Sequence, residues 1–282
     1  MLPATNPTQS RHPALWGGLL AAWSADMPGA GNRIVEPANQ LHAIWAGQDQ
    51  HPIVAGPGRR GFRFDGVNDT ANAGNRLATS QRSIALWVML SATAADAGLL
   101  TKASDSAFVS GTNTWGLFFD TNVVNTSLTN RFCFIERRIN GVASNWAQVC
   151  SATQPVIGRW YHVVVVRGAG RTELYIDGAR DEAYAQNTTS APGSETAYNH
   201  HLGSFNGAGG WLSGRLAEVL LYARALSPAE VRMLASGASP LERRRPNVTL
   251  RTASGVTLSP TGIASGEAVG TPTVQPGAVT IT

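Results

Sequence analysis

Residues 211–234, WLSGRLAEVLLYARALSPAEVRML, constrain the fold more than any other part of the chain. The first half is an apolar run that ends at Tyr222, which is the pattern of a buried strand. A short helix follows, because Ser227 and Glu230 have the spacing of a capping box and Pro228 suits the first helical turn. We therefore predict a strand, a short turn and one capped helix here.

Most of the preceding chain has the pattern of short strands. Apolar runs such as residues 84–90 and 160–166 are separated by turn signals of the Asp-Gly and Asn-Gly type. Many short strands with a single helix indicate an all-β, antiparallel sandwich. We predict an N-terminal arm over residues 1–14, the sandwich over 15–237, a linker over 238–246 and an extended C-terminal tail over 247–282.

Composition and charge exclude two classes of partner. The net charge is +4, and all but one of the 22 basic residues are Arg. These arginines are scattered and lack interleaved aromatic residues, so we expect no nucleic-acid partner. No apolar run reaches the roughly 18 residues of a membrane helix, so we expect no membrane partner.

The apolar stretch of residues 14–23 is compatible with two interpretations, a signal segment and a first strand. Two glycines inside the run and little positive charge before it favour a strand over residues 18–25. We therefore expect a chain that is made and kept without secretory cleavage.

The two cysteines lie on neighbouring predicted strands of one hairpin. A four-residue loop over residues 140–143 places Cys133 directly opposite Cys150, whereas a two-residue Asn-Gly turn separates them. Without an export signal, we expect two free thiols.

Six short motifs occur in an order that is similar to one family. They are residues 18–26, 64–69 (FDGVND), 83–88, 160–178 with its W-Y-H-V and L-Y-I-D-G parts, 201–203, and the closing stretch 211–234. Over roughly residues 18–237 the chain resembles the laminin-G-like jelly rolls of the concanavalin A-like lectin/glucanase superfamily. The resemblance implies a jelly-roll sandwich in which the closing stretch seals one end.

Glycosidases of this superfamily carry a Glu-x-Asp-x-x-Glu pattern, and this chain does not match it. Glu173 and Asp177 would stand roughly 13 Å apart on one strand. That separation exceeds the roughly 5 to 9.5 Å between the two carboxyl groups that hydrolysis uses. We therefore expect no enzyme, and glycoside hydrolysis is the least favoured alternative.

Two other groups of residues are candidate ligand sites. Asp65, Asn68 and Asp69 offer oxygens to calcium, although a turn stabilised by their side chains explains them more simply. No other cofactor is expected. For surface glycans the candidates are Asn206, Phe205 and Trp146. We expect five tryptophans to pack in the core: Trp23, Trp87, Trp115, Trp160 and Trp211.

The tail carries a second resemblance. Residues 259–274 (SPTGIASGEAVGTPTV) look like a segment near the ends of tailed-phage virion proteins. Together with the missing export signal, this implies a non-enzymatic structural protein of a bacteriophage virion, assembled in the host cytoplasm as a capsid decoration or tail component.

As a virion protein the chain would be a homo-oligomer docked on other virion proteins through its tail. The alternative is a carbohydrate-binding adhesion module. The apolar tail residues expected to dock are Val248, Leu250, Val256, Leu258, Ile263, Val269, Val274, Val279 and Ile281.

Overall fold

The computed structural model describes residues 5–27, 32–46, 53–55, 60–75, 81–93, 95–103, 114–123, 126–137, 146–168, 170–186, 188, 198–242, 250–251 and 257–258. The chain divides into two units, Met1–Arg243 and Arg244–Thr282. In the described part of the chain, no helix is long and apolar enough to cross a membrane.

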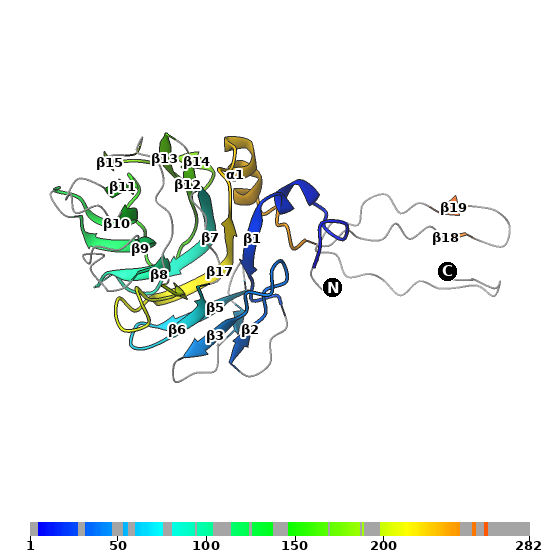
Figure 1. The fold of residues 1–282 in the computed structure, drawn as a ribbon, viewed down its shortest axis with the longest axis horizontal. Helices are drawn as coiled ribbons and strands as arrows, with labels where there is room; N and C mark the ends of the chain where they lie inside the picture. The colour runs from blue at the N-terminus through cyan, green and yellow to red at the C-terminus, as the bar shows by residue number, and fades with distance from the viewer. Residues whose placement is uncertain are drawn as a thin grey trace. The chain divides into compact units, whose positions relative to one another are not determined.

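The first sheet of the larger unit is antiparallel (Figure 1). Its order is β14 (Ala179–Arg180), β13 (Arg171–Ile176), β12 (Trp160–Gly168), β7 (Arg82–Leu90), β17 (Ser213–Tyr222), β5 (Arg60–Asp65) and β4 (Ile53–Ala55). An additional strand, β1 (Leu19–Trp23), pairs with the second half of β17 and confirms the first strand expected from the sequence.

The second sheet is also antiparallel. Its order is β15 (Tyr184–Gln186), β11 (Trp146–Cys150), β10 (Thr129–Arg137), β9 (Thr114–Asn122), β8 (Ala97–Lys102), β16 (His200–Leu202), β6 (Thr70–Gly74), β3 (Ala43–Ala46) and β2 (Arg33–Ile34). The two sheets pack face to face, with alternate residues of each strand in a shared apolar core. This confirms the all-β jelly-roll sandwich.

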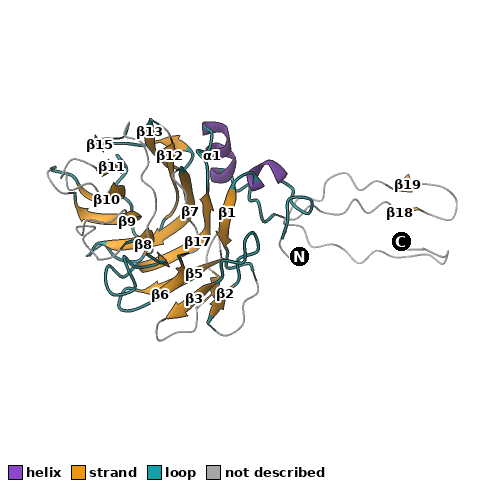
Figure 2. Cartoon of the chain, viewed as in Figure 1, coloured by secondary structure: helices purple, strands orange, loops and turns teal. Residues whose placement is uncertain are grey.

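The predicted closing element is present as β17 followed by helix α1 (Pro228–Ala235), drawn in purple in Figure 2. Ser227 Oγ accepts from the Glu230 amide at 3.3 Å, and the Glu230 carboxylate accepts from the Ser227 amide at 2.8 Å. An ion pair with Arg224 and bonds from Ser227 lower the pKa of Glu230 to about 2. Val231 and Leu234 bury the helix against the outer face of the first sheet.

The N-terminal segment packs against the residues that follow α1. A short 3-10 helix (η1, Pro13–Trp16) places the Trp16 indole so that Nε1 donates to the Pro240 carbonyl at 2.7 Å. The Arg11 amide donates to the Glu242 carbonyl at 2.7 Å, and their side chains form an ion pair. Part of the expected linker is therefore held on the sandwich.

The expectation of two free thiols is wrong. In the hairpin of β10 and β11, Cys133 is paired with Cys150, and the two form a disulfide with Cα atoms 4.1 Å apart. The expectation rested on the compartment, whereas the strand register decides which residues meet. Both cysteines are fully buried on the outer face of the second sheet.

Replacing both cysteines by Ala should lower the free energy of unfolding by about 2 to 4 kcal/mol, because a bridge across 17 residues restricts the unfolded chain. Denaturant unfolding of the oxidised protein and of the variant measures this difference. Wild-type protein unfolded with a reductant present should match the variant, and equal stability with and without reductant would contradict the prediction.

Candidate functional site

The outer face of the second sheet exposes an isoleucine at its β2–β3–β6 end. Along β3 the side chains alternate, so Ala43 and Trp45 enter the core while Ile44 points outward and is 46% exposed. Cross-strand pairing places Arg33 of β2 and Asn72 of β6 on either side of Ile44.

These residues surround an open hollow of about 770 Å³. Its lining mixes apolar side chains with amide and cationic groups: Arg33, Gln40, Leu41, His42, Ile44, Ala46, Asn72, Ala73 and Gly74. No Asp or Glu belongs to this set. A concave surface of this kind can offer both apolar and hydrogen-bonding contacts to a small ligand.

A buried carboxylate holds the loop at the edge of the hollow. Glu36 is fully buried and accepts backbone amides from Ala22, Ala38, Asn39 and Leu41 at 2.7 to 3.1 Å. This network fixes the turn that presents Gln40 and His42. The loop that carries Gln40 and His42 is therefore held by buried hydrogen bonds, although the sequence gives no local motif for this arrangement.

Loop 203–210 covers the neighbouring part of the same face. Thr101 Oγ1 donates to the Ser204 carbonyl at 2.9 Å, and a Cβ atom at Gly98 would lie only 2.2 Å from that oxygen. The loop buries Phe205, which is 5% exposed and packs edge-on against Phe118. The prediction that Phe205 contacts a glycan is corrected, because its ring belongs to the interior.

Of the other two glycan candidates, the structure describes the side chain of one. Asn206 is half-buried, and its Oδ1 accepts from the Ala208 amide at 3.1 Å within the loop. Trp146 begins β11, and its side chain lies outside the described residues.

The calcium candidates Asp65, Asn68 and Asp69 belong to a turn that is stabilised by side-chain to backbone hydrogen bonds. Asp65 Oδ1 accepts the amides of Val67 and Asn68 at 2.8 and 3.2 Å, and Asp69 Oδ2 accepts the Asp65 amide at 2.9 Å. Partial burial would raise the pKa of Asp65, but these amide donors hold it below its usual value. Among the described residues, no group of three His, Cys, Asp or Glu could hold a metal ion. Calcium binding stays a prediction.

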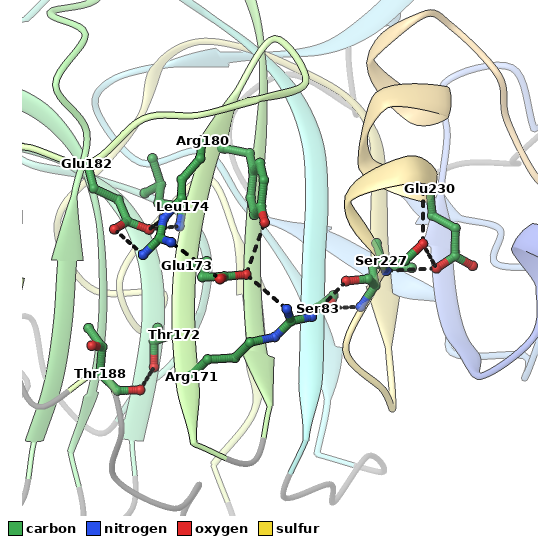
Figure 3. A network of polar contacts seen from close by, with 12 residues as sticks. Ser83, Arg171, Thr172, Glu173, Leu174, Arg180, Glu182, Thr188, Ser227 and Glu230 are labelled. Carbon is green, nitrogen blue, oxygen red and sulfur yellow. Dashed lines mark hydrogen bonds and ion pairs between the residues drawn. The ribbon is translucent and has the colours of Figure 1, made fainter.

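On the outer face of the first sheet, the carboxylates of Glu173 and Glu182 share one partner, Arg180. Arg180 forms ion pairs with Glu173 at 3.6 Å and with Glu182 at 2.9 Å, as Figure 3 shows. The Tyr175 hydroxyl donates to Glu173 at 3.0 Å. A guanidinium therefore occupies the space between the carboxylates that a glycosidic bond would need. Asp177, the other sequence candidate, accepts the His162 amide at 2.9 Å at a turn.

The tryptophans divide between the core and the surface. Trp23 and Trp115 are buried between the sheets as expected, and Trp211 is half-buried. Trp87 and Trp160 are also half-buried, but they lie on the outer face of the first sheet. The expectation of core packing is corrected for these two residues, because their neighbours Leu86, Val88 and Tyr161 take the inward positions.

Of the tail residues expected to dock, only two have a described backbone. Leu250 in β18 (Leu250–Arg251) pairs with Leu258 in β19 (Thr257–Leu258). The remaining docking candidates lie outside the described residues: Val248, Val256, Ile263, Val269, Val274, Val279 and Ile281.

Solved structures share the fold at low sequence identity. Trypanosoma rangeli sialidase with 2,3-difluorosialic acid superposes with a TM-score of 0.53 at 18% identity, covering 80% of this chain and 34% of the sialidase. The botulinum neurotoxin type G receptor-binding domain gives 0.52 at 13% identity, covering 84% of this chain and 58% of that chain. The chain thus spans about a third of the sialidase. Comparison with curated proteins gives no match.

A family model settles the relationship. A laminin-G model described as the concanavalin A-like lectin/glucanases superfamily matches residues 65–232, which is more than half of the chain. This range includes β6 to β17 and most of α1. The chain therefore belongs to the concanavalin A-like lectin/glucanases superfamily.

Proposed function

We propose that the protein is a non-enzymatic, glycan-binding component of a bacteriophage virion. The observation that carries the glycan-binding role is the hollow on the second sheet, where Ile44 is flanked by amide groups of Gln40 and Asn72. Sugars present apolar ring faces edged by hydroxyls, and this lining offers a partner for each. Because the lining holds no carboxylate, the hollow lacks the pair of acids that hydrolysis requires.

Replacing Ile44 by Ser should weaken glycan binding about tenfold or more, because the apolar contact with the sugar ring is lost. A glycan array with the whole chain identifies the ligand, and calorimetry then compares the variants. Ile157→Ser is the matched control, since Ile157 is 55% exposed on the turn before β12 of the other sheet. Silence of the wild-type protein across diverse glycans would contradict the glycan-binding role.

The virion role rests on the tail. Residues 259–274 resemble segments of tailed-phage virion proteins, and the tail belongs to a unit separate from the sandwich. Extended segments of small and β-branched residues can dock by adding a strand to a partner. The buried disulfide suits a particle that is exposed to oxidising surroundings after release.

A chain that ends at Arg243 should stay folded and fail to join the particle. This end point keeps Pro240 and Glu242, which hold the N-terminal segment. Thermal unfolding reports on the fold, and mass spectrometry of purified particles reports on incorporation. Full incorporation of the shortened chain would contradict the docking role of the tail.

A further inference from the structure

Two arginines face each other on the outer face of the first sheet. Arg63 of β5 is registered directly opposite Arg215 of β17, so their Cβ atoms lie about 4.5 to 5.5 Å apart. Both point outward, because the neighbouring Phe62, Phe64 and Leu216 occupy the core. Like charges at directly opposed positions destabilise a sheet.

Among the described residues, neither guanidinium makes a hydrogen bond or an ion pair, so no acidic partner there offsets the repulsion. The nearest carboxylate along β5, that of Asp65, is engaged by the amides of Val67 and Asn68. The fold therefore gives no structural reason for this pair.

A tryptophan lies on the same face, two strands away from Arg215. Trp160 pairs with Met89, and Met89 pairs with Arg215, so the four side chains Trp160, Met89, Arg215 and Arg63 form one row across β12, β7, β17 and β5. A Cβ atom at Gly61 would lie 3.1 Å from Trp160 Cη2, so the indole reaches across the face to β5. The ring is half-buried, and its Nε1 has no hydrogen-bond partner among the described residues.

We propose that this row, which we call the Arg63–Arg215 site, binds an acidic saccharide that carries a carboxylate or a sulfate. Two guanidinium groups suit such an anion, because each presents several N–H donors in a planar fork. The indole supplies a flat surface for the sugar ring that carries the charge. Two cations beside one aromatic ring fit a single charged residue of a glycan better than a nucleic-acid backbone, which needs an extended basic stripe. The site is on the opposite sheet from the hollow and does not depend on the proposed function.

The test compares binding of the whole chain to a heparin tetrasaccharide, a tetragalacturonic acid, a neutral cellotetraose and a single-stranded DNA 12-mer. We expect one or both acidic oligosaccharides to bind at low salt, to weaken as salt rises and to bind at least tenfold more weakly to Arg63→Gln/Arg215→Gln. Binding of the heparin tetrasaccharide alone shows that sulfate is needed, since heparin carries carboxylates as well, whereas binding of tetragalacturonic acid shows that a carboxylate is enough. Arg232→Gln, which removes an exposed charge from helix α1 outside both proposed sites, is the matched control and should bind like the wild type.

The double variant should also keep or raise its thermal midpoint, since it removes a repulsion, whereas a purely structural pair would lower the midpoint when lost. Several results would overturn the proposal: no binding of either acidic oligosaccharide, equal binding by the double variant, an equal loss of binding in Arg232→Gln, or equally tight binding of the DNA.

Discussion

Replacing Glu136 by Gln is expected to lower the free energy of unfolding by about 3 to 5 kcal/mol. Glu136 lies between the sheets, where Arg167 Nε donates to one carboxylate oxygen and Arg82 Nη1 lies 3.8 Å from the other. All three side chains are at most 4% exposed. The substitution keeps the shape of the side chain but leaves two buried guanidinium groups without this negative charge.

Glu182→Gln is the matched control for this measurement. Glu182 pairs with Arg180 at 2.9 Å; its carboxylate is 13% exposed, but the guanidinium is 58% exposed and can be solvated, so losing this pair should cost less than about 1 kcal/mol. Denaturant unfolding at neutral pH measures both variants. If Glu136→Gln loses no more stability than Glu182→Gln, the buried ion pairs of Glu136 with Arg82 and Arg167 do not contribute the stability expected of them.

The parts of the fold that could be predicted from the sequence are those set by local patterns. Helix α1 follows from the spacing of Ser227 and Glu230, and the closing strand follows from an apolar run, interrupted by Glu218, that ends at Tyr222. Both signals lie within a few residues of the element they specify. The disulfide could not be predicted from the expected cellular compartment, because the register of the β10–β11 hairpin is what brings Cys133 and Cys150 together.

The candidate sites could not be predicted, because they are assembled across strands that are distant in the sequence. Alternation along β12 shows that Trp160 and His162 share a face, but it does not show which face the core takes. Likewise, Arg63 and Arg215 meet only because β5 pairs with β17. An alternation analysis that first fixed the inward residues of each strand would have placed Ile44 at the surface.

Acidification from pH 7 to pH 4 is expected to destabilise the protein strongly through two buried histidines. Burial, with a contribution from nearby Lys102, lowers the pKa of His200 to about 3, and burial lowers the pKa of His201 to about 4. In the unfolded chain each histidine takes up its proton near pH 6.5, so the unfolded state binds more protons throughout this window. Stability is therefore complete above pH 6.5 and falls as the pH falls, by on the order of 3 kcal/mol at pH 4 for His200 alone.

His200→Asn separates this effect from general acid unfolding. His200 Nδ1 donates to the Gly74 carbonyl at 2.9 Å, and the Asn amide nitrogen can replace that donor without titrating. The variant should be less stable at pH 7, because it fills the buried site poorly, yet its stability should depend less steeply on pH between 6.5 and 4.5, by about one proton. The window stops at pH 4.5, near which Glu230 gains its proton in the unfolded chain, because the stability that Glu230 contributes is lost between there and its folded pKa of about 2. Denaturant midpoints measured at half-unit pH steps give both slopes. Equal slopes in the wild type and the variant would show that His200 is not the group whose burial makes the sandwich sensitive to acid.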